Sequence, residues 1–188
     1  YPEFFAKVPN NTNWVGIEIV LNGKELDLGS GEYTVKDFVR KLDMRTATYS
    51  RTFVVCDKAG RETSFGFTRF LSMDNKNAAC VTVDITPLNY NGHITIRPYL
   101  DGNVVNEDAN YNEVFWNRVS EQATPYPTVT METKKTFFRQ TCSMACSCDI
   151  DGKMISAKAN ILREKYVEQE FETLINQKEC ISLAKIVC

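Results

Sequence analysis

Cysteine is the residue type in this 188-residue chain with the greatest capacity for chemistry, and the chain has seven cysteines. Cys142, Cys146 and Cys148 are the closest group, and thiolates suit zinc and iron–sulfur centres. On an extended strand, however, neighbours on one face lie about 6.6 to 6.8 Å apart, and Cys142 and Cys146 about twice that. Thiolates on one tetrahedral zinc must lie within about 4 Å of each other. We therefore expect these cysteines to pack in the core as small apolar side chains, with no metal bound.

Acid–base chemistry has few candidates. His93 is the only histidine and follows Gly92 at a predicted turn, so a Ser–His or Cys–His relay could use this residue alone. An exposed or hydrogen-bonded turn residue is the simpler interpretation. Asp57, Asp74 and Asp101 lie in predicted turns, whereas glycoside cleavage needs two carboxyl groups about 5 to 9.5 Å apart around the bond. No glycine-rich loop has the spacing of a phosphate cradle. We predict no catalytic residue and no cofactor.

Aromatic residues near turns and loops are candidates for ligand contact. Sugar rings stack on aromatic side chains, although packing in the core is the commoner role of such residues. We select four aromatic residues as candidates for contact with a carbohydrate or with another domain: Trp14, Tyr90, Tyr111 and Trp116.

Arginines form a second group of candidates. Four of them fall within the middle of the chain: Arg45, Arg51, Arg61 and Arg69. The simpler interpretation is structural, with each guanidinium paired to Asp43, Asp57 or another carboxylate at a strand end. The alternative is contact with another domain or a dimer partner, because the planar guanidinium suits interfaces.

Composition restricts the possible partners and the compartment. Lys plus Arg is 22 and Asp plus Glu is 24, which gives a formal net charge of −2. This balance gives no electrostatic reason to expect nucleic acid or an anionic membrane as partner. No apolar run is long enough to span a bilayer, and no signal-peptide pattern is present. An odd number of cysteines at these spacings favours a reducing compartment, so we expect a cytoplasmic protein, with export as the alternative.

The elements that must position these residues are predicted to be strands. Residues 48–55 and 61–70 are rich in Thr, Val, Phe and Tyr and flank a turn that ends at Gly60, a hairpin signal. Residues 78–87 alternate apolar and polar side chains, as a strand with one dry face does. Residues 94–100 follow as a further strand. This middle region is predicted to be an antiparallel meander.

The remaining chain is predicted to add more strands, at residues 14–21, 24–28, 33–44, 114–119, 154–161 and 179–187, with one long strand or two paired ones over 128–149. Residues 162–175 give conflicting signals. Their apolar spacing and their Glu and Lys content favour a helix, but no N-cap residue or capping box precedes them.

Six short motifs in one order and spacing resemble a known family: Leu42-Asp43-Met44-Arg45, Arg51, Asp57-x-x-Gly60-Arg61-x-Thr63, Arg69-Phe70-x-Ser72-Met73, Thr86-Pro87-Leu88-Asn89-x-x-Gly92 and Leu100-Asp101-Gly102-x-Val104-x-Asn106. They are similar to the N-terminal β-sandwich domain of glycoside hydrolase family 65, the maltose, kojibiose and trehalose phosphorylases and their hydrolase relatives. Residues 9–26 and 179–187 also fit, so the resemblance covers most of the chain and is densest over 42–106. Asn77, where the family pattern has His, and Ala47, where it has Gly, depart from the pattern at turns.

The resemblance implies an all-β fold, an antiparallel super-sandwich of two large packed sheets similar to galactose mutarotase. It places residues 1–188 in a single domain, with a strand over 162–175. It also implies a non-catalytic N-terminal domain of an α-glucoside phosphorylase or hydrolase that acts on disaccharides. Such a domain would pack against a downstream helical-barrel catalytic domain of the same polypeptide, here called the parent polypeptide, and support a homodimer. In the family, the general acid and the phosphate-binding loop lie in that barrel.

Two other functions stay open. One is a stand-alone carbohydrate-binding β-sandwich, which predicts saturable sugar binding that an exposed Trp→Ala change abolishes. The other is a mutarotase-like epimerase, whose fold relatives use a pair of histidines and a carboxylate. The single His93 argues against that activity.

Overall fold

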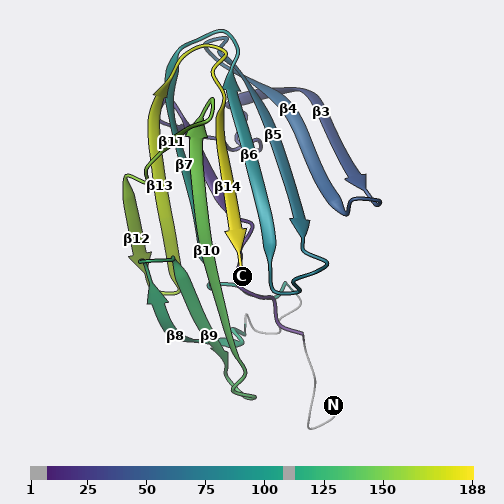
Figure 1. Ribbon diagram of the computed structural model, residues 1–188, viewed down its shortest axis with the longest axis vertical. Coiled ribbons are helices and arrows are strands. Elements are labelled where there is room, and N and C mark those ends of the chain that lie inside the picture. The colour runs from purple at the N-terminus through teal and green to yellow at the C-terminus, as the bar shows by residue number, and fades with distance from the viewer. Residues whose placement is uncertain (1–7, 108–112) are drawn as a thin grey trace.

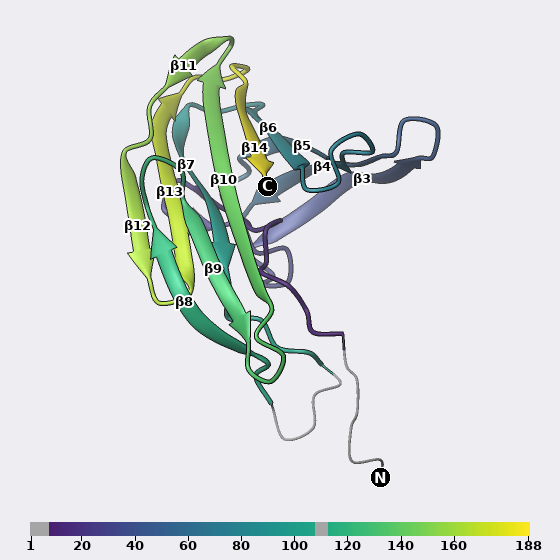
Figure 2. The ribbon, with the colours of Figure 1, turned by 60° about the horizontal axis from the view of Figure 1, so that its bottom comes forward.

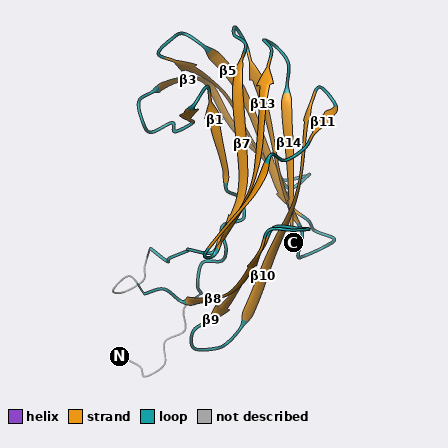
Figure 3. Ribbon diagram, turned by 90° about the vertical axis from the view of Figure 1, so that its left-hand side faces the viewer, coloured by secondary structure: helices purple, strands orange, loops and turns teal. Residues whose placement is uncertain are grey.

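The computed structural model describes residues 8–107 and 113–188, and in these ranges the backbone forms two antiparallel sheets joined by turns and loops (Figure 1). Colouring by secondary structure shows strands and loops, with no helix in the described ranges (Figure 3). Accordingly, this part of the chain contains no helix that could cross a membrane. The expectation of an all-β fold with two large antiparallel sheets is confirmed.

The smaller sheet has five strands, in the order β12 (Ala159–Arg163), β13 (Tyr166–Ile175), β7 (Gly92–Asp101), β1 (Ile17–Leu21) and β2 (Lys24–Glu25). Strand β7 lies in the middle and pairs with β1 on one side and β13 on the other. The sheet therefore joins the beginning, the middle and the end of the chain.

The larger sheet has nine strands, in the order β3 (Tyr33–Asp43), β4 (Thr48–Asp57), β5 (Glu62–Leu71), β6 (Ala79–Pro87), β14 (Ile181–Val187), β10 (Arg139–Ile150), β9 (Thr128–Thr133) and β8 (Trp116–Gln122), with β11 (Lys153–Ile155) beside β10. Strands β3 to β6 pair in sequence, so the predicted meander is confirmed as far as β6. Of the two alternatives for residues 128–149, the pair of strands is confirmed.

The prediction that the meander continues through residues 94–100 is wrong, because β7 belongs to the smaller sheet. The free edge of β6 is occupied instead by β14 from the end of the chain. The link from β6 to β7 is held in place where the backbone N–H of Leu88 donates to the carbonyl of Glu62 and the Asn89 side chain bridges Glu62 and Gly60. Alternation within a strand does not determine which neighbour the strand pairs with.

The segment after β10 differs in part from the prediction. The single return strand expected over residues 154–161 is wrong, since β11 pairs with β10 whereas β12 joins the smaller sheet. Residues 166–175 form β13, so the strand expectation is confirmed there and the helix alternative is wrong. Val167, Phe171 and Ile175 are buried. Residues four apart share a face on a helix and on a strand alike, which explains the conflicting signals.

The inner faces of the two sheets meet in an apolar core. Phe65 and Ile85 of the larger sheet and Ile94 and Ile96 of the smaller sheet are almost fully buried in one cluster. Burying a side chain of this size contributes about 1.5 to 3 kcal/mol. A second cluster, which includes Trp116, joins β8, β9 and β10 to the ends of β7 and β13. Apolar contacts therefore hold the two sheets face to face wherever the smaller sheet covers the larger one.

Strands β3 to β5 extend beyond the smaller sheet, which ends at the two-residue strand β2. Figure 2 shows these three strands running away from the smaller sheet. On the outermost strand, β3, Tyr33 is buried and most of the following residues are exposed. We call the inner surface of these strands the open face and define it by residues that share that side in the strand register: Phe38, Arg40, Leu42, Tyr49, Arg51, Phe67, Arg69 and Leu71.

Candidate functional site

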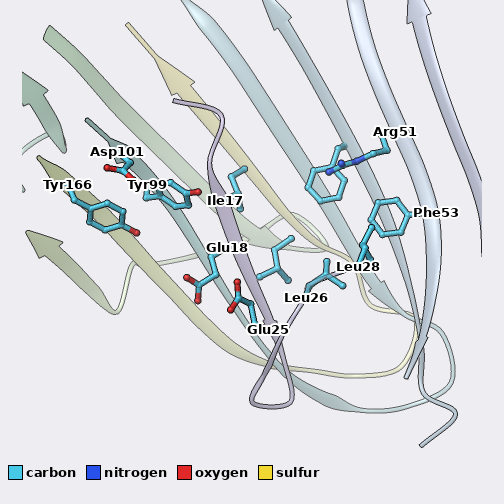
Figure 4. Close-up of a pocket in the computed structure, with 12 residues that line it drawn as sticks. Ile17, Glu18, Glu25, Leu26, Leu28, Arg51, Phe53, Tyr99, Asp101 and Tyr166 are labelled. Carbon is cyan, nitrogen blue, oxygen red and sulfur yellow. The ribbon is translucent and has the colours of Figure 1, made fainter. Parts of the chain in front are cut away.

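Two adjoining cavities lie where β1 of the smaller sheet borders the open face, and Figure 4 shows the residues that line the larger one. The larger has a volume of about 450 Å³ and the smaller about 250 Å³. Both are lined by Ile17, Arg51 and Phe67, so together they form one site, here called the β1–β4 groove. Figure 4 shows Arg51 and Phe53 on one side of the larger cavity and Tyr99, Asp101 and Tyr166 on the other. Both sheets therefore contribute to the groove.

The period-2 pattern of β4 and β5 explains why polar and apolar groups meet here. Phe53 and Phe65 point inward under the smaller sheet and are almost fully buried, with ring centroids 5.2 Å apart. Further along the same faces, Arg51 lies opposite Phe67, and Tyr49 lies opposite Arg69. The inward positions therefore change from phenylalanine to arginine and tyrosine where the smaller sheet ends.

Arg51 is the central side chain of the groove. Its guanidinium carbon lies 4.4 Å from the ring centroid of Phe67 and 5.6 Å from that of Phe53, within range of cation–π contact. Its Nε atom is buried and has no hydrogen-bond partner among the described residues. Burial lowers the pKa of Arg51 below its ordinary value, and the nearby guanidinium groups of Arg40 and Arg69 act in the same direction. Arginine stays charged nonetheless, so the groove presents a cation that lacks an acceptor.

Two more arginines of the open face contact aromatic rings. The guanidinium carbon of Arg40 lies 5.0 Å from the ring centroid of Phe38, and that of Arg69 lies 4.7 Å from the ring centroid of Tyr49. Neither of these arginines, nor Arg51, forms an ion pair with a carboxylate within residues 8–107 and 113–188. The open face therefore carries three positive charges with no counter-ion from the described chain.

The structural role expected for the arginines holds for only some of them. Arg61 pairs with Asp57 at 2.7 Å between Nε and Oδ2, as expected for a strand end. Arg45 contacts Asp43 only through its backbone N–H, which donates to Oδ1 at 3.0 Å, and its guanidinium forms no ion pair within the described residues, so the expected pairing is wrong there. For Arg51 and Arg69 the expected pairing with a carboxylate is wrong within the described residues, because both point along the open face, away from strand-end carboxylates.

Three acidic side chains line the opposite wall of the groove, Glu18, Glu25 and Asp101, and two of them have partners among the described residues. Glu18 pairs with Arg97 of β7, and Asp101 accepts a hydrogen bond from the backbone N–H of Asn103 at 2.8 Å. Burial raises the pKa of Tyr166, and its hydrogen bond to Glu168 acts in the same direction. Opposite walls of the groove thus differ in the sign of their charge: this wall carries carboxylates, of which Glu18 is paired with Arg97, and the other wall carries arginines without a carboxylate partner in the described chain.

Of the predicted aromatic residues that the structure describes, it brings together Trp14 and Trp116 but places Tyr90 elsewhere. Trp14 and Trp116 pack on the second core cluster, where the indole N–H of Trp116 donates to the carbonyl of Asn10 at 2.7 Å. Tyr90 lies at the link before β7, with its hydroxyl 2.8 Å from that of Thr63. Tyr111 lies outside the described residues. Contact of these residues with a carbohydrate or another domain stays a prediction.

Sequence reasoning missed the aromatic lining of the groove. Phe53, Phe67, Tyr99 and Tyr166 line the larger cavity but come from four strands and both sheets. One signal was present in the sequence: Arg51 occupies an inward position of β4, between Tyr49 and Phe53. A charged residue at an inward position of a predicted strand is rarely buried without a partner, so it indicates either a buried polar contact or an uncovered surface there.

The single histidine lies outside the groove. Nε2 of His93 is 2.7 Å from Oε1 of Glu172, and Glu172 also pairs with Lys158. Both His93 and Glu172 are partly exposed side chains of the smaller sheet. The expectation of an exposed or hydrogen-bonded turn residue is confirmed only in part: the backbone N–H of His93 donates to Oδ1 of Asn22 at 2.9 Å, but the residue lies in β7 and not in a turn.

The cysteine group lies within the packed part of the fold. Cys142 and Cys148 are buried, as predicted, and Cys146 is half-buried against both core clusters. Burial raises the pKa of Cys142 to about 11 and that of Cys148 to about 12. The described residues contain no group of three or more His, Cys, Asp or Glu placed to hold a metal ion.

A buried cation beside these cysteines provides a contrast to Arg51. Lys185 of β14 is fully buried, and its ammonium donates to the carbonyls of Gly16 at 3.0 Å and Tyr99 at 2.6 Å. Burial lowers the pKa of Lys185 to about 8. These hydrogen bonds connect the larger sheet to the smaller one, so the role of Lys185 is to join the two layers.

Comparison with known proteins gives a consistent picture. A sequence model of the family described as "Glycosyl hydrolase family 65, N-terminal domain" matches residues 1–188. The chain is 38% identical over 125 residues to a maltose phosphorylase of Bacillus subtilis, covering 65% of this chain and 16% of that protein. It is 25% identical over 185 residues to a kojibiose phosphorylase of Halothermothrix orenii, covering 97% of this chain and 23% of that protein.

The fold is also similar to a solved structure described as a kojibiose phosphorylase from human microbiome. The TM-score is 0.80 at 23% sequence identity, and the match covers 95% of this chain and 22% of that chain. At this identity the similarity shows the fold alone. The chain spans less than a quarter of the length of each of these relatives.

Proposed function

The chain belongs to the family described as glycosyl hydrolase family 65, N-terminal domain, and on this premise we propose that it is the non-catalytic N-terminal domain of an α-glucoside phosphorylase or hydrolase acting on disaccharides. The two relatives compared above are named maltose phosphorylase and kojibiose phosphorylase. Each is several times longer than the matched part. In this proposal the chemistry belongs to a helical-barrel catalytic domain of the parent polypeptide, and residues 1–188 are part of a super-sandwich that supports this domain.

The observation that carries this proposal is the uncovered open face. Phe38, Leu42 and Leu71 on this face are 40%, 64% and 62% exposed. Exposed apolar side chains gathered on one surface are typical of an interaction site. Arginines among them add groups that recognise carboxylates. We propose that the catalytic barrel covers this face and that other surfaces of the domain support a homodimer.

Activity measurements on the isolated chain and the parent polypeptide test the proposal. Both would be incubated with maltose, kojibiose and trehalose, with and without inorganic phosphate, and assayed for glucose and glucose 1-phosphate. The expected result is turnover by the parent polypeptide and none by residues 1–188. Turnover by the isolated chain would refute the non-catalytic role.

A stand-alone carbohydrate-binding module remains a second candidate, favoured by the aromatic rings that line the β1–β4 groove. It predicts saturable binding of maltose or kojibiose to the isolated chain. Calorimetric titration with these sugars distinguishes the two functions, since the first function requires no sugar affinity of this chain alone.

We propose a cytoplasmic location for the protein. All seven cysteines are free thiols, as a reducing compartment would keep them. Cell fractionation followed by detection of the parent polypeptide tests this location, and recovery from the medium or periplasm would contradict it.

A further inference from the structure

Arg51 is a half-buried cation whose buried Nε atom lacks an acceptor among the described residues. A buried polar group without a hydrogen bond is costly, and a buried charge is more so. The Nε atom of Arg51 is such a group within the described residues, and the neighbouring Arg69 brings a second positive charge along the same face. A carboxylate placed here could accept hydrogen bonds from both guanidinium groups, which are suited to bidentate contact. The wall of the groove formed by β4 and β5 therefore matches a negatively charged group, whereas Glu18, Glu25 and Asp101 line the opposite wall.

The edge of β1 beside the groove is open. Gly16 accepts a hydrogen bond from Tyr99 of β7, so the next residue, Ile17, directs its backbone N–H and C=O to the other side of the strand. On that side β2 pairs with Val20 and Leu21, and the backbone N–H of Leu26 donates to the carbonyl of Ile19 at 2.8 Å, so the pairing stops before Ile17. The backbone of Ile17 thus lies at a free strand edge directly beside the cavity that its own side chain lines. Free edges of this kind accept an added strand.

The lining between this edge and Arg51 is apolar. Ile17 and Phe67 line both cavities, and Phe53 and Leu26 line the larger one. An extended segment beside β1 would direct every second side chain into this lining, about 6.6 to 6.8 Å apart. A small anion would contact the arginines but leave the rings and the backbone edge uncovered. The combination of an edge, an apolar lining and a cation fits a polypeptide strand.

We propose that an extended segment of the parent polypeptide, outside residues 1–188, lies in the β1–β4 groove as an additional strand beside β1 and places a carboxylate on Arg51 and Arg69. The segment has alternating apolar side chains toward Ile17 and Phe67, with an Asp or Glu in the same row. This inference rests on the proposed function, because it requires the chain to be part of a longer protein. It specifies which surface of the domain the rest of that protein contacts, and that the contact combines strand pairing with an ion pair.

Photo-crosslinking in the parent polypeptide tests the proposal. Tyr49 is replaced by p-benzoylphenylalanine, which keeps an aromatic ring at the border of the groove, and the cross-linked peptide is identified by mass spectrometry. The expected product is an intramolecular cross-link to a segment beyond residue 188 that contains Asp or Glu. A cross-link to a second copy, to a segment without a carboxylate, or to nothing would overturn the proposal.

Amide hydrogen exchange of the unmodified protein provides a second measurement that does not depend on the substituted residue. The amide of Ile17 should exchange at least about tenfold more slowly in the parent polypeptide than in the isolated chain, because a new hydrogen bond protects it. Arg51→Gln should abolish most of this protection. Arg139→Gln, which removes an exposed arginine of β10, is the matched control and should leave it unchanged. Equal exchange of Ile17 in both proteins would overturn the proposal.

The outcomes separate this inference from the proposed function. If the parent polypeptide is active and the isolated chain is not, but no cross-link or protection forms at the groove, the domain role stands and the added strand is wrong. If the isolated chain itself turns over disaccharide, the proposed function fails, whatever occupies the groove.

Discussion

Strands β4 and β5 pass through two environments, and the contrast between them explains the organisation of the molecule. At one end, Phe53 and Phe65 face the smaller sheet and are 2% and 1% exposed. At the other end, Tyr49 and Arg69 occupy equivalent inward positions on the open face. The alternation of inward and outward side chains is the same at both ends of these strands. The two ends differ only in whether the smaller sheet covers them. Side chains at the covered end hold the fold together, whereas those at the open end are available to a partner.

The two regions also differ in the hydrogen-bond partners that they offer to a positively charged side chain. Lys185 in the covered region satisfies its ammonium with two backbone carbonyls. Arg51 on the open face has aromatic rings against its guanidinium but no acceptor for Nε within the described residues. The charge of Lys185 is therefore satisfied within the fold, whereas that of Arg51 is left for the segment proposed above.

The largest expected effect lies in the covered region. Phe65→Ala removes a nearly fully buried ring from the centre of the core, and such a change costs about 3 to 5 kcal/mol. Urea denaturation of the isolated chain measures the free energy of unfolding. Phe67→Ala, on the half-buried side, is the comparison and should cost clearly less. Equal losses would mean that the two regions are equally packed.

Lys185 should make stability depend on pH. Its folded pKa is lowered from 10.5 to about 8, so the unfolded chain binds more protons than the folded chain between these values. Stability contributed through this group therefore rises as pH increases from about 8 to 10.5, by up to about 3 kcal/mol. The measurement is the difference in unfolding free energy between the native chain and Lys185→Met across this range, which cancels most of the opposing effect of the buried cysteines. A difference that stays constant with pH would contradict the buried, partnered lysine.

Arg51→Met should have opposite effects in the two contexts. In the isolated chain it removes a partly buried cation that lacks an acceptor, so the unfolding free energy should change by less than about 1 kcal/mol or increase. In the parent polypeptide the same change should be destabilising, since it leaves the proposed carboxylate unpaired. Thermal unfolding of both proteins gives the two values. A clear loss in the isolated chain would show that Arg51 already has its partner within residues 1–188.

The smallest expected effect concerns the rim of the open face. Leu42 is 64% exposed, so Leu42→Ser in the isolated chain should change the unfolding free energy by no more than about 0.5 kcal/mol. In the parent polypeptide a covered Leu42 would make the change more costly. Parallel denaturant titrations of the two proteins check this difference, and identical small effects would indicate that Leu42 stays exposed.

Local patterns predicted the strands better than their partners. Alternation over residues 78–87 and the turn at Gly60 identified β6 and the β4–β5 hairpin, because both depend on nearby residues only. The position of β7 could not be predicted in this way, since it depends on β14 occupying the edge of β6. Pairing between distant strands is determined by how the whole sheet assembles.

The groove was predictable only in part. Arg51 and Arg69 were identified from the sequence, with a structural ion pair as the simpler interpretation and an interface as the alternative. Whether an inward arginine has a carboxylate beside it depends on where the smaller sheet ends. That limit is determined by the short strand β2, which is only two residues long. The sequence around Arg51 and Arg69 does not show where the smaller sheet ends.

Hydroxyl-radical footprinting of the open face is the most direct test of the central claim that a segment of the parent polypeptide covers this surface. Leu42 and Leu71 would be labelled in the isolated chain and in the parent polypeptide, with exposed Met154 of β11 as the internal reference. The account predicts strong labelling of both leucines in the isolated chain and protection of both in the parent polypeptide, with Met154 labelled equally. Equal labelling of the leucines in the two proteins would contradict it.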